Sequence, residues 1–137
     1  MIQQTISVTT KEASAAQLWR LMAAVDQWAD WDPTIESARL SGPFATGSRF
    51  KLRPKGGPAV TIRLEEVREG AYFRDCTRFP GARMYGEHWY EPVADGLKIT
   101  VTMTMRGPLG FLWNRLVMKD IVANLPEDLK RQISNAR

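Results

Sequence analysis

The chain begins with a short alternating segment and then changes to a helical pattern. Residues 3–10 alternate apolar and polar side chains, which predicts a strand. Residues 11–25 place apolar side chains three or four positions apart, which predicts an amphipathic helix. We expect a second, shorter helix directly afterwards, because Asp26 can cap its first turn and the Asp32-Pro33 pair ends it.

From residue 34 onward the hydrophobic period becomes two. Six alternating segments follow one another, separated by glycine- and proline-rich turn signals, which predicts six consecutive antiparallel strands. The expected strands are residues 34–40, 48–54, 59–67, 71–79, 83–93 and 96–106.

The last thirty residues return to helical spacing, which predicts a long helix over residues 107–136. We expect Pro126 to kink or restart this helix, because an internal proline loses one backbone hydrogen bond and clashes with the preceding turn. The order of elements predicts an α+β domain in which the C-terminal helix covers one face of an antiparallel sheet. The predicted apolar stripe of this helix consists of Leu109, Leu112, Leu116, Val117, Ile121, Leu125, Leu129 and Ile133.

Turn sequences also predict which residues lie opposite each other. A two-residue turn at Asp95-Gly96 would place His88 opposite Met103 and Tyr90 opposite Val101. A turn at Glu69-Gly70 would place Leu64 opposite Asp75, Ile62 opposite Thr77 and, on the outer face, Glu65 opposite Arg74.

A third turn, centred on Gly81-Ala82, would place Asp75 opposite His88. All three turns put the even-numbered positions 84–90 on the same, mostly apolar face. We therefore expect Asp75 and His88 to be cross-strand neighbours on the concave side of the sheet, with Thr77 and Tyr90 nearby.

Composition sets the broad class. A chain of 137 residues with 44% hydrophobic and 25% charged residues fits one globular domain over residues 1–137. Cys76 is the only cysteine, which excludes an intrachain disulfide and fits a cytoplasmic protein. The first ten residues lack the basic and apolar regions of a signal peptide, and no apolar run is long enough to span a bilayer.

The net charge of +4 is a mild excess of basic residues. Its most local feature is the series Arg49, Lys51, Arg53 and Lys55, which would share one face of a strand. A solvated outer face is the favoured interpretation and an anion-binding patch is the alternative. No nucleic-acid-binding motif accompanies these residues, so we expect no nucleic-acid partner.

The sequence contains no recognisable cofactor or metal motif. One histidine and scattered carboxylates cannot build a standard zinc site, and the segment "PKGGP" lacks the spacing of a phosphate-binding loop. We therefore expect neither a metal nor a cofactor.

Three segments together resemble a known superfamily. They are "VDQWADWDP" after the first helix, Gly47-Ser48-Arg49-Phe50 at the entry to a strand, and "HWYEPVADGLKITVTMTMRGPLGFL" before the final helix. The chain resembles the SRPBCC superfamily, which includes the lipid-transfer START domains, the major birch-pollen allergen and the polyketide cyclase/dehydrase group. It is most similar to small bacterial members of the last group.

The resemblance implies a helix-grip fold. In this fold a curved antiparallel sheet of six to seven strands wraps around a long C-terminal helix, and two short helices follow the first strand. The cavity between sheet and helix holds hydrophobic ligands, lipids or polycyclic substrates. Some members are enzymes and many only bind or carry a ligand, and the family has no universal catalytic residue set to transfer to this chain.

The leading hypothesis for function is therefore binding of a small hydrophobic or aromatic ligand. The alternative is an enzyme of the cyclase or dehydratase type, with His88 as general base, Asp75 fixing its tautomer and Tyr90 donating a hydrogen bond. A weaker third reading is an interaction module that uses the basic outer strand. The residues expected to line the ligand site are Trp28, Trp31, Phe50, Leu52, Ile62, Leu64, Phe73, Thr77, Met84, Met103, Met105, Leu112 and Leu116.

Each candidate also has a plain structural reading. His88 can be a wall residue satisfied by a carboxylate, and the methionines can be ordinary core residues. Trp28 and Trp31 can pack the short helix against the sheet rather than gate a cavity. Cys76 falls on the outer face with no base beside it, so we do not expect it to be a nucleophile. The sequence leaves the oligomeric state and enzymatic activity open.

Overall fold

The computed structural model describes all residues 1–137 and contains the seven strands expected from the alternating segments. They form a single antiparallel sheet in the order β1-β7-β6-β5-β4-β3-β2. The strands are β1 (Ile2–Thr10), β2 (Ile35–Ser41), β3 (Arg49–Pro54), β4 (Val60–Arg68), β5 (Tyr72–Phe79), β6 (Ala82–Val93) and β7 (Gly96–Arg106).

Two helical segments separate β1 from β2, as predicted. They are α1 (Ala15–Ala23) and α2 (Trp28–Trp31), joined by a 3₁₀ turn at Val25–Gln27. Ser14 and Gln17 form a capping box at the start of α1, in which each side chain accepts a hydrogen bond from the other's backbone N–H. The apolar stripe of α1 buries Leu18, Trp19 and Met22.

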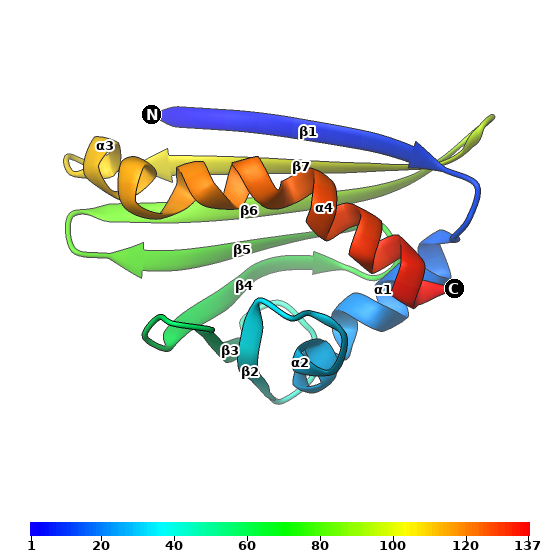
Figure 1. Ribbon diagram of the computed structural model, residues 1–137, viewed down its shortest axis with the longest axis horizontal. Coiled ribbons are helices and arrows are strands. Elements are labelled where there is room, and N and C mark those ends of the chain that lie inside the picture. Colours follow the sequence, from blue (N-terminus) through cyan, green and yellow to red (C-terminus); the bar gives the residue numbers. More distant parts are fainter.

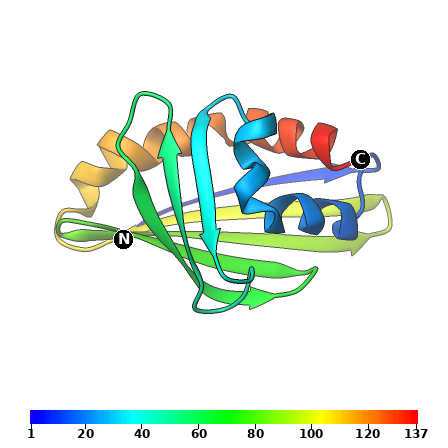
Figure 2. The same ribbon diagram turned by 90° about the horizontal axis from the view of Figure 1, so that it is seen from below.

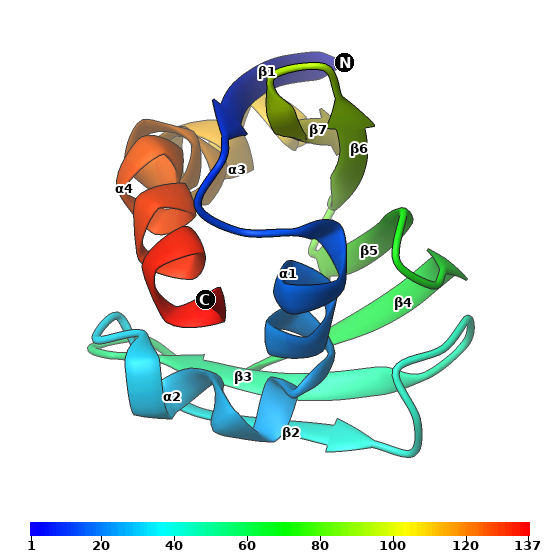
Figure 3. The same cartoon turned by 90° about the vertical axis from the view of Figure 1, so that its right-hand side faces the viewer.

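The sheet is strongly curved and wraps around the C-terminal helix. Figure 3 shows it passing from β1 through β6, β5 and β4 to β3 and β2, with the long helix closing the open side. β2 and β3 run steeply across the direction of β1, β6 and β7, as Figure 2 shows. This arrangement confirms the helix-grip fold, and its concave side faces α1 and the C-terminal helix (Figure 1). None of the helices combines the length and apolar character needed to cross a membrane.

The C-terminal helix has three parts: α3 (Gly110–Trp113), a π-helical segment (Asn114–Met118) and α4 (Lys119–Ala136). Pro126 lies inside α4, so the helix is not restarted there. The axis of α4 bends about midway along its length (Figure 1), in agreement with the predicted kink. Leu125, Leu129 and Ile133 are buried, and α4 packs against α1 and β1.

The predicted apolar stripe is wrong at its N-terminal end. Leu109 is 39% exposed and Leu116 is 56% exposed, so Leu116 does not line the space between helix and sheet. A π turn holds an extra residue, which rotates the following positions around the helix axis. Met118 is fully buried as a result, while Val117 and Ile121 pack against the core.

Two hairpin registers differ from the prediction by two residues. In β6–β7 the turn residues are Ala94 and Asp95, so His88 lies opposite Val101 rather than Met103, and Tyr90 lies opposite Ile99 rather than Val101. Gly96 instead belongs to β7 with a φ of +131°, and a Cβ there would collide with the backbone of Thr10 at the end of β1. This close approach explains why glycine stands inside the strand rather than in the turn.

The β5–β6 turn consists of Pro80 and Gly81, which places Asp75 opposite Gly86 and Phe73 opposite His88. The predicted direct pairing of Asp75 with His88 is therefore wrong, and the two are diagonal neighbours. A shift of two residues leaves every side chain on its original face. Met84 and Tyr90 belong to the buried core, which confirms the predicted inward direction of the even-numbered positions.

In β4–β5 the predicted pairs Leu64 with Asp75 and Ile62 with Thr77 are confirmed. A bulge then follows Leu64, so Glu66 rather than Glu65 lies opposite Arg74. The bulge supplies one extra residue on β4, and the turn after it is one residue longer than predicted. The longer turn and the bulge offset each other, so Leu64 and Ile62 keep their predicted partners Asp75 and Thr77.

Candidate functional site

Asp75 and His88 lie next to each other on the concave side of the sheet. His88 Nε2 lies 3.5 Å from Asp75 Oδ2, which makes an ion pair when the imidazole is protonated. The side chain of Asp75 remains 18% exposed and that of His88 15%, so a water-sized molecule can reach both. The carboxylate can therefore orient an imidazole that is neither freely solvated nor sealed in the core.

Gly86 creates the room for this pair. It lies directly opposite Asp75 on β6, and a Cβ at this position would be 2.9 Å from Asp75 Oδ1 and 3.1 Å from Oδ2. Such distances are too short for a real side chain. The local sequence Tyr85-Gly86-Glu87 thus lets an inward-facing carboxylate lie flat over β6 and reach His88.

The imidazole ring is fixed from its other side by an aromatic residue. Phe73 stacks on His88 with a centroid distance of 4.1 Å and an interplanar angle of 12°. Phe73 in turn contacts the edges of Trp19 and Phe44 at 6.1 and 5.2 Å. These contacts restrict the orientation of the imidazole ring, as a positioned acid–base or hydrogen-bonding group requires.

Tyr90 completes the polar cluster. Its side chain is almost fully buried, and its hydroxyl has no hydrogen-bond partner in the protein. Burial raises the pKa of the Tyr90 phenol well above its usual value, and the nearby Asp75 carboxylate adds to the effect. The hydroxyl therefore stays protonated and can donate a hydrogen bond. We refer to Asp75, His88 and Tyr90 as the polar cluster.

The residues predicted to line a ligand site differ in how much of their surface is exposed. Trp28 packs edge-on against Phe50 at 5.3 Å and donates its Nε1–H to the Met22 carbonyl at 3.1 Å, which is a structural role. Trp31, Leu52, Ile62 and Leu112 keep part of their surface exposed, and Leu116 is turned to solvent. The fully buried members are Trp28, Phe50, Leu64, Phe73, Thr77, Met84, Met103 and Met105.

The largest apolar cavity lies elsewhere, at the end of the sheet near α1. It has a volume of about 1080 Å³ and is bounded by α1, the β2–β3 loop and the end of β4. Trp19 and Phe44 form its inner wall, and Arg20 and Glu69 lie among its polar members. None of the five main cavities is lined by a residue of the polar cluster.

Contacts between aromatic rings link the wall of this cavity to the polar cluster. Trp19 and Phe44 contact each other edge to face at 5.6 Å, and Trp19 also contacts Tyr90 at 6.1 Å. The sequence analysis missed both residues. The apolar spacing over residues 11–25 predicts a helix without singling out Trp19, and Phe44 follows a Gly-Pro turn where an apolar residue carries no periodic signal.

Asp32 has the turn-forming role that was expected of it. Its Oδ1 accepts hydrogen bonds from the Thr34 backbone N–H at 2.9 Å and from the Thr34 hydroxyl at 2.6 Å. Arg131 of α4 lies 3.4 Å from the same oxygen and 3.1 Å from Asp128. Burial raises the pKa of the Asp128 carboxyl, and the charge of Asp32 adds to this effect. The cluster ties α4 to the segment after α2.

Cys76 lies on the convex face, as predicted, and is buried there. Burial raises the pKa of its thiol, and the neighbouring Glu65 carboxylate raises it further. A thiol of this kind is a poor nucleophile at neutral pH. No group of three or more histidine, cysteine, aspartate or glutamate side chains is placed to hold a metal ion.

Comparison with solved structures supports the fold over nearly the whole chain. The crystal structure of Ara h 8.0201 matches with a TM-score of 0.74 and 16% identity, covering 98% of each chain. A hypothetical protein, jhp0584 from Helicobacter pylori, matches with a TM-score of 0.78 and 13% identity, covering 99% of this chain and 88% of that one. Identities this low show a shared fold and nothing finer.

A third similar structure is the di-domain ARO/CYC protein BexL from the BE-7585A biosynthetic pathway. It matches with a TM-score of 0.73 and 20% identity, covering 98% of this chain and 46% of that one. A search of curated proteins finds no significant match. The sequence also matches the family model described as polyketide cyclase / dehydrase and lipid transport, over residues 1–135. The chain therefore belongs to the polyketide cyclase / dehydrase and lipid transport family.

Proposed function

We propose that residues 1–137 act as one domain that binds a small hydrophobic or aromatic molecule on the concave side of the sheet. The polar cluster would recognise a carbonyl or hydroxyl group of that molecule. The likeness to the ARO/CYC protein BexL extends the candidate ligands to polycyclic aromatic compounds. The single buried thiol of Cys76 is compatible with the cytoplasmic location that we also propose.

The observation that carries this proposal is the unpartnered hydroxyl of Tyr90 beside the Asp75–His88 pair. A buried hydroxyl without a partner costs free energy, so a natural structure that keeps one invites an explanation. A ligand acceptor atom would satisfy this donor. Small-molecule sites combine mostly apolar walls with a few placed polar groups, and the polar cluster together with its apolar neighbours could supply both.

The apolar part of the site would come from the partly exposed concave side chains. Trp31, Leu52 and Ile62 keep accessible surface, unlike the buried methionines. The Trp31 indole N–H is also buried without a partner and is a second unused donor. The cavity beside Trp19 and Phe44 would offer an apolar entrance, since Trp19 lines it and contacts Tyr90.

Native mass spectrometry of the protein purified from cells tests for a retained ligand. Binding would then be titrated with that ligand or with the probe 1-anilinonaphthalene-8-sulfonate, following fluorescence. Tyr90→Phe removes the inward hydroxyl, and we expect it to weaken binding of the retained ligand about tenfold. Tyr85→Phe is the matched control, because it removes a hydroxyl from the opposite face of β6. Equal affinities of the two variants would contradict the proposed site.

A second candidate function is supported by the Asp75–His88 geometry. In it His88 acts as general base, oriented by Asp75, on an acidic C–H or a hydroxyl of the bound molecule. The pairing distance of 3.5 Å and the stacked Phe73 ring support a positioned imidazole. His88 lines none of the five main cavities, and neither do Asp75 and Tyr90, so both candidate functions require the ligand to enter past Trp19 and Phe44.

Product analysis with the retained ligand separates the two functions. If the protein is an enzyme, we expect His88→Ala to lower kcat at least a hundredfold. Asp75→Asn would lower it less, because the imidazole would lose the carboxylate that orients it. Turnover that is unchanged in His88→Ala would remove the proposed base.

A further inference from the structure

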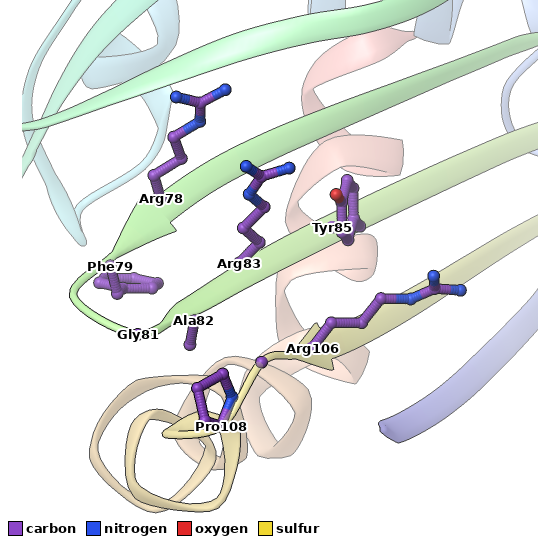
Figure 4. A pocket seen from close by; sticks show the side chains of 9 residues that line it. Arg78, Phe79, Gly81, Ala82, Arg83, Tyr85, Arg106 and Pro108 are labelled. Carbon is purple, nitrogen blue, oxygen red and sulfur yellow. The ribbon is translucent and has the colours of Figure 1, made fainter.

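The convex face of the sheet carries a row of three arginines at one end. Arg78 of β5 lies directly opposite Arg83 of β6, and Arg83 lies directly opposite Arg106 of β7. Residues that face each other across neighbouring strands project from the same face of the sheet. Figure 4 shows Arg78 and Arg83 extending in the same direction and Arg106 extending from the end of β7. We call these three residues the arginine row.

No carboxylate forms an ion pair with the arginine row. All three side chains are exposed, and none takes part in an ion pair of the structure. Glu65 and Glu66 line a neighbouring depression together with Arg78 and Arg83, but their ion pairs are with Arg63 and Arg68. Like charges placed directly opposite each other are unfavourable in a sheet. Three arginines in succession across neighbouring strands therefore indicate a site that binds an anion.

The row borders a depression of about 530 Å³. Its other walls include Phe79, Ala82 and Pro108, which are apolar, and Tyr85. Gly107 also lines the depression. A side chain at this position is excluded, because its Cβ would lie 2.5 Å from the Gly81 carbonyl oxygen. A volume of this size fits a small molecule.

The chemistry of the lining defines the class of ligand. A guanidinium group donates a fork of parallel N–H groups that matches the oxygens of a phosphoryl group, and several guanidinium groups favour several phosphoryl charges. The apolar walls add a surface for an uncharged part of the same molecule. We propose that the arginine row binds a small phosphorylated molecule that carries two or more negative charges.

A single-stranded nucleic acid fits this surface less well. Such binding uses free aromatic rings on which the bases stack. Tyr85 is the aromatic residue on the convex side of the depression, and the Arg74 guanidinium already covers its ring at 4.4 Å. The site is also separate from the polar cluster, because the two lie on opposite faces of the sheet.

Isothermal titration calorimetry with inorganic tripolyphosphate at low ionic strength tests the proposal. We expect Arg83→Gln to weaken binding at least tenfold, and Arg83→Lys to weaken it severalfold because lysine keeps the charge but loses the fork. The matched control is Lys98→Gln, which removes one positive charge from the same face of β7 about 27 Å from Arg106. We expect its affinity to stay within twofold of the unsubstituted protein.

Unfolding is not expected to obscure the result, because Arg83→Gln removes repulsion from the row and should leave the melting temperature unchanged or raised. A dissociation constant weaker than about 1 mM for the unsubstituted protein would overturn the proposal. Equal weakening by Lys98→Gln would also overturn it, since binding would then follow net charge alone. Tighter binding to a single-stranded oligonucleotide, lost equally in Arg49→Gln and Arg83→Gln, would assign the face to nucleic acid instead. Binding only to phosphatidylcholine vesicles that contain phosphatidic acid would assign it to a lipid surface.

Discussion

The carboxylate of Asp75 occupies the space that a side chain at position 86 would need, so Gly86 and Asp75 form a matched pair across β5 and β6. Gly86 has no unusual backbone conformation, and its role is therefore steric. This pair explains how an inward carboxylate is accommodated on a mostly apolar face. It also makes the geometry of the polar cluster open to a direct test.

Gly86→Ala is expected to destabilise the fold by about 1–3 kcal/mol, because the new methyl group must displace the Asp75 carboxylate. Urea unfolding measures the change. Adding Asp75→Ala to this variant should recover part of the loss, since the two substitutions are in contact and are not additive. Gly110→Ala is the control, because a Cβ at that position makes only ordinary contacts, the nearest at 3.5 Å. Additive effects at positions 75 and 86 would contradict the steric explanation.

The π-helical segment predicts opposite outcomes for two leucines of the predicted stripe. Leu129 is 1% exposed, so Leu129→Ala should cost about 2–5 kcal/mol. Leu116 is 56% exposed, so Leu116→Ala should change stability by less than about 0.5 kcal/mol. Denaturant midpoints of the two variants check this. A large loss in Leu116→Ala would mean that the first turns of the helix face the core as the regular stripe predicted.

Two of the tyrosines should resist ionisation in the native protein. Burial raises the pKa values of Tyr72 and Tyr90, and for Tyr72 a 2.8 Å hydrogen bond to Glu87 adds to the effect. The unfolded chain loses these protons near pH 10, whereas the folded chain retains them. Stability should therefore fall as pH rises from about 10, because the folded state then binds more protons.

Ultraviolet titration of tyrosinate, with circular dichroism recorded in parallel, measures this behaviour. Ionisation of Tyr72 and Tyr90 should coincide with the loss of structure. The variants Tyr72→Phe and Tyr90→Phe identify the two contributions. Ionisation of both groups in a protein that is still folded would contradict the assigned burial.

Cys76 should react with thiol reagents only when the protein opens. The residue is 5% exposed, and the pKa of its thiol is raised by burial and by Glu65, so little thiolate forms at neutral pH. We expect labelling by a maleimide to be slow in buffer and to accelerate across the urea transition. Glu65→Gln should lower the thiol pKa and modestly accelerate the native-state reaction. Rapid labelling of the folded protein would contradict the buried position.

Asp128 should give the contact between α4 and the segment after α2 a pH dependence. Its folded-state pKa is raised by burial and by Asp32, so the folded state binds the proton more tightly than the unfolded state. The protonated Asp128 carboxyl therefore stabilises the fold below the unfolded-state pKa of about 3.9. This contribution is lost as pH rises through the pKa of the folded state. Relative to the unsubstituted protein, Asp128→Asn should gain stability with rising pH over this range. A stability difference that does not change with pH would show that the carboxyl is not perturbed.

The alternation of side chains along the strands could be predicted from sequence. His88, Tyr90 and Met84 were expected to face inward and do so, although two hairpin registers are shifted by two residues. The reason is physical: the pleat reverses the side chain at each position, and a shift of two preserves the face. The same local patterns predicted seven strands, the helices between β1 and β2, and the long C-terminal helix.

The exact partners across the sheet depended on contacts distant in sequence. Gly96 lies inside β7 because the end of β1 passes too close for a side chain, which the local Asp-Gly turn signal does not reveal. The aromatic wall of Trp19 and Phe44, and the arginine row, likewise join residues from separate elements. Local sequence therefore determined which way each side chain faces. Only the tertiary structure decided which side chains meet, because register and helix phase are set by packing between segments far apart along the chain.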